Sequence, residues 1–256
     1  KIGQREHQAH NQFVSDLEDL LQHIDIDYDK FKPYELDSTT IPDYDLVITA
    51  GGDGTVLHVA PYMDGVPLLG GNSHYTKDNN GSVGALTSFD RRNINNLRYI
   101  DEANIAKWHF LEASINGDKV DDFAVNDIYI GHPVPYKNSH LKVEVGDQKE
   151  RLTGSGLICC TPMGSHAWFK NAGGTEFPNE LNSFGILLRD PDTKYMTYKF
   201  TERIVANGQD NRITPTRMPC IMAYDSRESS QIELQPGHNI SFSVSDKYLE
   251  VLKFDG

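Results

Sequence analysis

The sequence predicts two domains: an α/β domain with a Rossmann-like, doubly wound sheet over residues 1–99, and an all-β domain over residues 100–256. In the first domain, short apolar runs that end in glycines alternate with helical spacing, which is typical of a parallel sheet covered by helices. In the second, short alternating runs follow one another between turn residues, which is typical of an all-β domain. A chain of 256 residues also exceeds the length of most single domains. Whether the C-terminal segment packs back on the first domain is left open.

The first domain is expected to begin with an amphipathic helix from Gln4 to His23, where apolar residues follow helical spacing. A strand is expected at Leu46–Ala50, a short helix near Val56–Met63 and a second strand at Val66–Gly70. The turn after each strand then lies at the carboxyl edge of the sheet, where doubly wound folds bind their ligands.

Alternating apolar runs predict the strands of the second domain, and glycine, proline and Asn/Asp turns separate most of them. The runs are 108–115, 123–130, 141–145, 156–160, 184–188, 220–224, 232–234, 240–244 and 248–254.

Composition narrows the class of protein. The formal net charge is −13, from 24 basic and 37 acidic residues, which argues against a nucleic-acid partner and against an anionic membrane surface. The three cysteines are an odd number, and Cys159 and Cys160 are adjacent, which favours a reducing compartment. No run approaches about eighteen apolar residues. We therefore expect a cytoplasmic protein that binds neither nucleic acid nor membrane.

Gly51, Gly52, Asp53, Gly54 and Thr55 form a glycine-rich turn between the first strand and the following helix. Glycines leave backbone N–H groups open to a phosphate, and the helix N-terminus adds partial positive charge. A carboxylate beside a phosphate is repulsive unless it accepts a proton from an attacking hydroxyl or holds a cation that bridges to the phosphate. The alternative is that Asp53 simply caps the helix.

Four further segments carry polar groups suited to a nucleotide. Asn72, after the second strand, opens onto the same sheet edge as the glycine turn. Asn126 and Asp127 can form hydrogen bonds with a ribose or with the edge of a base, although Asn-Asp pairs are also common in turns. The loop from Thr161 to Trp168 offers hydroxyl donors and a flat ring for stacking, unless Trp168 lies in the core. Asp225 ends a predicted strand and supplies another carboxylate.

Other site types are disfavoured. The histidines and cysteines lack the spacing of a metal site, so no protein-bound metal is expected. The chain also lacks the P-loop motif and the nucleophile elbow of hydrolases.

The order of these motifs resembles the NAD kinase family, from about residue 45 to the C-terminus. The glycine turn is shared with lipid kinases and phosphofructokinase relatives, whereas Gly156–Ser165 followed by Gly173 and Gly174 is the more specific part. Ser155, His166 and Trp168 make the chain look closer to the mitochondrial-type branch of the family. The resemblance implies transfer of the γ-phosphoryl group of ATP, accompanied by Mg²⁺ or another divalent cation, to the 2′-hydroxyl of the adenosine ribose of NAD.

The resemblance also implies residue roles and a homodimer or homotetramer. Asp53 would be the catalytic carboxylate. Residues expected to bind the nucleotides are Gly51, Gly52, Gly54, Thr55, Asn72, Asn126, Asp127, Thr161, Ser165, Ala167, Trp168 and Asp225. Lys77, Arg91 and Arg92 are basic candidates near the site.

The chain departs from the family pattern at three positions. Ser155 stands where many members have Asp, Asp127 where they have Glu, and His166 where they have Thr or Ser. Two alternatives therefore stay open: a lipid or other small-molecule kinase with the same glycine turn, and a dinucleotide sensor without catalytic activity.

Overall fold

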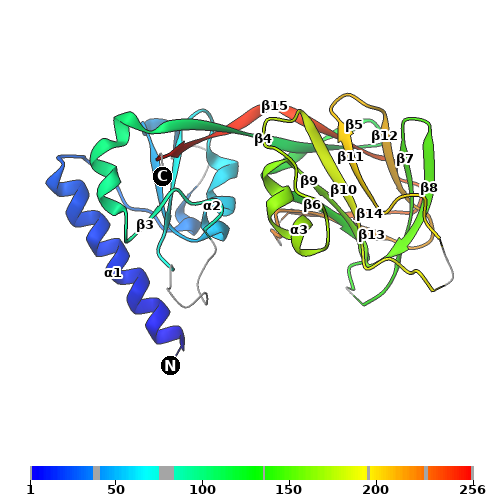
Figure 1. Cartoon of the computed structure of the whole chain (residues 1–256), viewed down its shortest axis with the longest axis horizontal. Coiled ribbons are helices and arrows are strands. Elements are labelled where there is room, and N and C mark those ends of the chain that lie inside the picture. The colour runs from blue at the N-terminus through cyan, green and yellow to red at the C-terminus, as the bar shows by residue number, and fades with distance from the viewer. Residues whose placement is uncertain are drawn as a thin grey trace. The chain divides into compact units, whose positions relative to one another are not determined.

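The computed structural model describes residues 2–36, 41–74, 84–134, 136–194, 197–227 and 230–254. An α/β region is followed by a β-rich region, which confirms the predicted fold class (Figure 1). The chain divides into two compact units: residues 1–107 with 249–256 form unit 1, and residues 108–248 form unit 2. Among the described residues, no helix is long and apolar enough to cross a membrane.

Unit 1 is built on a small parallel sheet. Strand β2 (Leu68–Asn72) pairs in parallel with β1 (Val47–Gly51), with β3 (Phe89–Asp90) and, at Leu68, with the end of β15 (Ile240–Lys253). Its α-helices are α1 (Ile2–His23) and α2 (Asp53–Val59). Short 3₁₀ helices are Pro33–Glu35, Ile41–Asp43, Ala60–Tyr62 and Ile94–Glu102.

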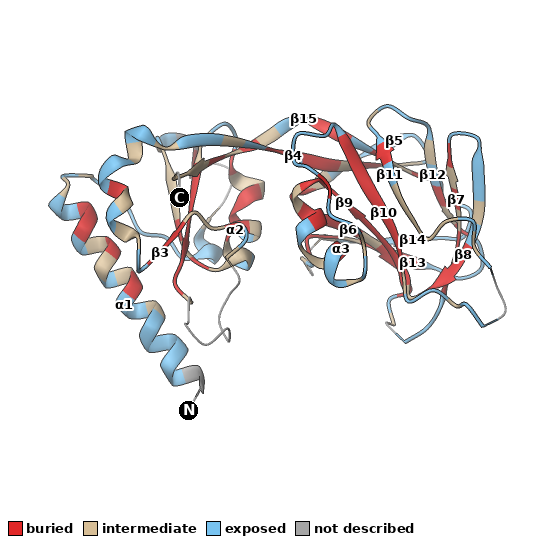
Figure 2. Ribbon diagram, viewed as in Figure 1, coloured by how far each residue is buried: buried red, intermediate tan, exposed pale blue. Residues whose placement is uncertain are grey.

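The helices of unit 1 cover opposite faces of this sheet, as in a doubly wound fold (Figure 1). Neighbouring residues of a strand face opposite sides. A Cβ atom on Gly70 would approach Val56 of α2, whereas one on Gly71 would approach Phe13 of α1. Figure 2 shows a row of buried residues along α1, and this row packs with Leu69 and Phe89 in the core of unit 1.

Unit 2 consists mainly of antiparallel strands in two sheets. One sheet has the strand order β11-β10-β9-β6-β13-β14, and in the other β15-β12-β7-β8 are neighbours, with β4 pairing β15 and β5. The strands are β4 (Asn104–Ile115), β5 (Asp118–Ala124), β6 (Asp127–Gly131), β7 (Ser139–Val145), β8 (Gln148–Gly154), β9 (Gly156–Cys160), β10 (Ser183–Arg189), β11 (Glu202–Ala206), β12 (Asn211–Pro215), β13 (Cys220–Tyr224) and β14 (Gln231–Leu234).

Alternate side chains from both sheets form the core of unit 2. On β9, Leu157 and Cys159 join this core, and Ile158 and Cys160 pack on the other side with Phe169 and Phe177. That second layer comes from the segment with the 3₁₀ helix Met163–His166 and α3 (Trp168–Asn171). Because β9 is covered on both faces, it is apolar along its whole length.

The strand predictions needed corrections in three places. The predicted run 123–130 breaks at Val125 and Asn126 into β5 and β6. The runs 240–244 and 248–254 join into one strand, β15. Strands β3, β8, β11 and β12 were not predicted, because β3 has only two residues and the other three carry charged or amide side chains.

Candidate functional site

The glycine turn joins β1 to α2 in unit 1. Gly52 is the N-cap residue of α2, and its backbone is extended. A Cβ atom on Gly51 would lie 1.9 Å from Oγ1 of Thr55, so the turn has no room for a side chain at this position. A Cβ atom on Gly54 would meet no heavy atom of the described residues within 4 Å. Phosphate binding by this turn stays a prediction.

The Asp53 carboxylate is held by a segment distant in sequence. Oδ1 accepts a hydrogen bond of 2.8 Å from the backbone N–H of Leu86, and Oδ2 accepts one of 3.2 Å from that of Ala85. Asp53 is not the N-cap residue of α2, since Gly52 has that position, and the Asp53 carboxylate bonds Leu86 and Ala85 instead. These two hydrogen bonds from backbone amides fix the orientation of the carboxylate, as a proton acceptor requires.

Asn72 and Ser73 connect β2 to the glycine turn. The side chain of Asn72 is buried, and its Oδ1 accepts a hydrogen bond of 3.0 Å from the backbone N–H of His74. The backbone N–H of Ser73 donates to the carbonyl oxygen of Gly51 at 2.7 Å. The structure therefore brings Asn72 and the glycine turn together at the carboxyl edge of the sheet.

The basic residues near this turn differ from those expected. Arg91 forms an ion pair of 2.5 Å with Asp16, and Arg92 one of 2.6 Å with Asp90. Lys77 lies outside the described residues, as does the polar stretch 75–83. Sequence reasoning missed Lys253, whose ammonium donates to the carbonyl oxygen of Thr87 at 2.9 Å.

Lys253 also interacts electrostatically with Asp53. Burial lowers the pKa of Lys253 to about 8, although the Asp53 carboxylate acts in the opposite direction. The two residues are 200 positions apart in the chain. The available sequence signal was a lysine within the apolar run Val251–Phe254, which is unusual for a solvent-facing charge.

In unit 2, Asp225 holds the bend between β5 and β6. Its Oδ2 accepts a hydrogen bond of 2.8 Å from the backbone N–H of Val125, and its Oδ1 accepts bonds of 2.8 and 3.1 Å from Asn126 and Asp127. Asp225 and Ser226 both have left-handed backbone conformations, with φ of 47° and 56°. The turn after β13 is thus shaped to present this carboxylate to three amides.

Asn126 and Asp127 are themselves buried, and their polar groups are unusual for such positions. Oδ1 of Asn126 is buried without a hydrogen-bond partner among the described residues. Burial, and secondarily the charge of Asp225, raise the pKa of Asp127 to about 8. Burial also raises the pKa of Asp225, although the three hydrogen bonds from backbone amides favour its charged form and lower the pKa. The bend therefore combines an unsatisfied acceptor with a carboxyl group that is mostly protonated at neutral pH.

The loop after β9 packs against the same bend. The backbone N–H of Thr161 donates to the carbonyl oxygen of Asn126 at 2.9 Å, and the Thr161 hydroxyl donates to that of Val125 at 2.6 Å. The Ser165 hydroxyl donates to the carbonyl oxygen of Pro162 at 2.7 Å and accepts from the N–H of Phe177 at 3.2 Å. Both hydroxyls are buried and bonded within the protein. They hold the loop in place, which differs from the expected donors open to a ligand.

Trp168 lies in this loop, is partly exposed, and packs against the apolar cluster that contains Phe169 and Phe177. Its ring is 5.6 Å from that of Tyr129, and the Arg189 guanidinium lies 5.6 Å from its centre. The neighbouring Phe169 is buried. Ala167 is also partly exposed. These residues form an aromatic and cationic surface beside the loop.

His166, which departs from the family pattern, lies in an exposed network. Its Nδ1 is 3.0 Å from Oε1 of Glu176, which also pairs with Lys170 at 2.7 Å.

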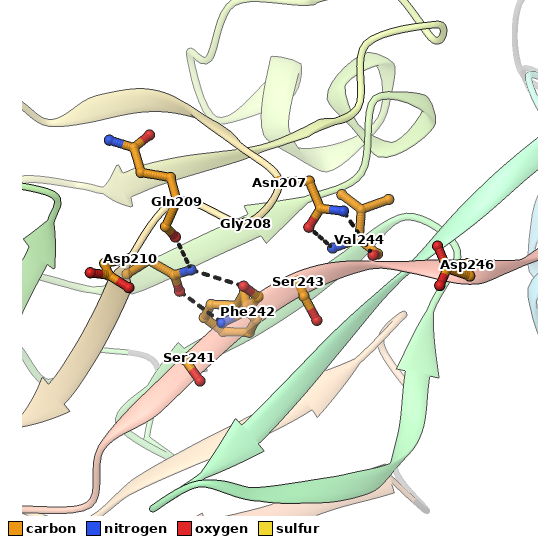
Figure 3. Close-up of a pocket in the computed structure, with 10 residues that line it drawn as sticks. Asn207, Gly208, Gln209, Asp210, Ser241, Phe242, Ser243, Val244 and Asp246 are labelled. Carbon is orange, nitrogen blue, oxygen red and sulfur yellow. Dashed lines mark hydrogen bonds between the residues drawn. The ribbon is translucent and has the colours of Figure 1, made fainter.

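Unit 2 also has an open pocket of about 410 Å³ between β15 and the turn after β11 (Figure 3). Asn207 and Asn211 bond the backbone of Val244 and Phe242 there, each side chain acting as both donor and acceptor. The remaining lining includes the carboxylates Asp210 and Asp246. Because these carboxylates repel phosphates, this pocket is poorly suited to a dinucleotide.

The described residues contain no group of three or more His, Cys, Asp or Glu side chains that could hold a metal ion.

The chain was compared with known proteins in sequence and in fold. No protein-family model matches the chain. It is 29% identical to a probable NADH kinase of Oryza sativa subsp. japonica over 72% of the chain and 62% of the rice protein. It is 36% identical to an NAD kinase of Rhizobium meliloti over 53% of the chain and 52% of that protein. The NAD kinase of Methanothermobacter thermautotrophicus is 30% identical over 57% of the chain and 50% of its own length.

The chain thus spans between half and about two thirds of the curated relatives it matches. The fold is similar to the crystal structure of an NAD kinase from Archaeoglobus fulgidus in complex with ATP. The TM-score is 0.75 with 19% identity, and the match covers 94% of this chain and 89% of the other. The chain is thus similar in sequence to NAD kinases and a probable NADH kinase, and its fold is similar to that of an NAD kinase.

Proposed function

We propose that the protein is an NAD kinase that transfers the γ-phosphoryl group of ATP to the 2′-hydroxyl of the adenosine ribose of NAD. The observation that carries this proposal is the Asp53 carboxylate, fixed by the amides of Ala85 and Leu86 beside the glycine turn. Similarity in sequence to NAD kinases supports the identity of the two substrates. The products are NADP and ADP.

Asp53 would act as the proton acceptor in this reaction. As the ribose hydroxyl attacks, a bond forms between its oxygen and the γ-phosphorus, and the bond from that phosphorus to the β-γ bridging oxygen breaks. The hydroxyl proton passes to the Asp53 carboxylate. Phosphoryl transfer asks mainly for positioning and neutralisation of charge, so a carboxylate with a fixed orientation is a suitable partner.

The bend at Asn126 and Asp127 would bind the adenosine part of NAD. Oδ1 of Asn126 lacks a partner among the described residues and can accept a hydrogen bond from the ligand. A protonated Asp127 can donate a hydrogen bond and does not repel the pyrophosphate of NAD. This property offsets part of the excess negative charge of the chain.

Mg²⁺ would enter as part of the MgATP substrate, because the described residues offer no metal cluster of their own. Its chemical contribution is neutralisation of charge on the triphosphate. We also propose a homodimer or homotetramer, as the family resemblance implies, and light scattering of the purified protein tests this. Assignment to the mitochondrial-type branch stays a prediction.

One assay separates the proposed function from its alternatives. The purified chain is incubated with NAD, ATP and Mg²⁺, and NADP is followed with an NADP-specific dehydrogenase. Formation of NADP supports NAD kinase activity, and a parallel reaction with NADH establishes which redox form is preferred. Tight binding of NAD without product would favour a sensor. Absence of both binding and product would favour a kinase with another acceptor, such as a lipid.

A further inference from the structure

Phosphoryl transfer at Asp53 requires positive charge in unit 1, and the arginines expected to supply it are engaged elsewhere. Arg91 pairs with Asp16 and Arg92 with Asp90. The chain carries a formal charge of −13, so its overall field repels a triphosphate. A local cation is therefore needed close to the glycine turn, in addition to the Mg²⁺ that accompanies ATP.

Lys253 is in the right place for this role. It lies at the end of β15, which pairs in parallel with β2 through Val251 and Leu68. The Ser88 hydroxyl donates to the carbonyl oxygen of Leu252 at 2.5 Å, which ties this strand end to the segment after Gly84. The sheet and this segment together fix the position of the Lys253 backbone.

The same segment links Lys253 to Asp53. Ala85 and Leu86 donate their N–H groups to the Asp53 carboxylate, and the next residue, Thr87, accepts a hydrogen bond from the Lys253 ammonium. The two side chains attract each other electrostatically. Three consecutive residues thus hold the carboxylate and the ammonium at one location.

We propose that Lys253 is the cationic residue of the Asp53 site, and that its ammonium group contacts a phosphate group of the donor nucleotide. This inference rests on the proposed function for the identity of that nucleotide. A partly buried ammonium binds an anion more strongly than an exposed one, because water screens the attraction less. It also costs less to bring a phosphate to a lysine that is already positioned.

The test compares Lys253→Met and Lys253→Arg with the wild-type protein. Lys247→Met is the matched control, because Lys247 is an exposed lysine on the same strand. Binding of MgATP and of inorganic tripolyphosphate is measured by calorimetry, and thermal unfolding verifies that each variant is folded. We expect Lys253→Met to weaken both ligands about tenfold to a hundredfold, the usual effect of losing a hydrogen bond to a charged group. The affinities of Lys253→Arg for both ligands should stay within a few-fold of the wild-type values, and those of Lys247→Met should equal the wild-type values.

The pH dependence separates a charge effect from a packing effect. The pKa of Lys253 is about 8; among the described residues, Asp53 on α2 is a charged group that interacts with it, and Thr87 contributes a carbonyl oxygen. MgATP affinity of the wild type should therefore fall as the pH rises through about 8. Arginine stays protonated over this range, so the affinity of Lys253→Arg should stay nearly constant.

Three results would overturn the inference. The first is a folded Lys253→Met protein that binds MgATP as tightly as the wild type. The second is an equal loss of MgATP affinity in Lys253→Met and Lys253→Arg. The third is a loss of NAD affinity in Lys253→Met without a loss of MgATP affinity. Failure of the proposed function has a different signature, namely no NADP formed by the wild-type protein. In that event, binding of tripolyphosphate still tests Lys253.

Discussion

Asp53 is the residue on which the proposed reaction depends most directly. In Asp53→Asn, the amide oxygen can still accept the N–H of Leu86, but the NH₂ group faces the N–H of Ala85 and cannot take a proton. We expect kcat to fall about 10²- to 10⁴-fold, the usual contribution of a general base. Affinities for NAD and ATP, measured by calorimetry, should change little.

The control for this substitution is Asp64→Asn, because Asp64 is an exposed aspartate of unit 1. Its kcat should equal that of the wild type. Turnover of Asp53→Asn close to the wild-type rate would remove Asp53 from the proton transfer.

Asp127 gives a second prediction for a single residue, on stability. Its pKa is raised from 3.8 to about 8 in the folded chain. Between these values the unfolded state has lost the proton that the folded state keeps, so the free energy of unfolding decreases as pH rises. The contribution of Asp127 to the free energy of unfolding is fully present below about pH 4 and is lost as the pH rises through about 8. Asp127→Asn removes this contribution and should make stability less dependent on pH.

Urea unfolding at several pH values from 5 to 8 measures this difference, with Asp121→Asn as a control at an exposed position. Groups that do not interact with Asp127 titrate alike in the wild type and the variant, so they cancel in the comparison, whereas Asp225 interacts with Asp127 and contributes to the difference. Equal pH dependence of the wild type and Asp127→Asn would mean that Asp127 is ionised in the folded protein.

Among the secondary-structure elements, the turn after β13 shapes the proposed adenosine site. Asp225 there accepts the N–H groups of three residues at the β5–β6 bend. Asp225→Ala would leave these buried amides without an acceptor, at about 1–3 kcal/mol for each unsatisfied group. We expect the free energy of unfolding to fall by at least about 3 kcal/mol. NAD affinity should fall as well, because the bend presents Asn126.

Chemical denaturation and NAD titration measure the two effects. Asp246→Ala is the control, since Asp246 is an exposed aspartate of β15. Unchanged stability of Asp225→Ala would show that water can replace the carboxylate at the bend.

Elements were predictable from sequence where one pattern dominates. The helix α1 and the strands β1, β2 and β9 have clear apolar periodicity, and the structure contains them within a few residues of the predicted limits. The polar strands β8, β11 and β12 were not predictable, because neighbouring strands and the shared core define them. The break between β5 and β6 was also missed, since its cause is Asp225, about a hundred residues away.

The same distinction applies to the candidate site. Glycines and Asp53 could be recognised because they are contiguous. The supporting contacts from Ala85, Leu86 and Lys253 depend on residues 32 to 200 positions away, which only the folded chain brings close. Thr161 and Ser165 were expected to bind the nucleotides, and the burial of their hydroxyls, which bond within the protein, could not be predicted from the sequence.

At the scale of the whole molecule, the cysteines offer a probe of how ligand binding stabilises the fold. Cys159 and Cys160 lie on β9 and Cys220 lies on β13, and all three are free and buried in unit 2. Burial raises the pKa of each thiol, so none forms a reactive thiolate in the folded state. Labelling by a thiol reagent such as DTNB therefore requires unit 2 to open.

NAD should slow this labelling if it binds unit 2 at the bend of Asn126 and Asp127. A ligand that binds only the folded state lowers the open fraction by the factor 1 + [NAD]/Kd. The rate in mild urea, measured by absorbance over a series of NAD concentrations, should follow this factor with the Kd from calorimetry. Nicotinamide mononucleotide, which lacks adenosine, should protect much less. A labelling rate independent of NAD at saturating concentrations would mean that dinucleotide binding does not involve unit 2, and would remove Asn126 and Asp127 from the site.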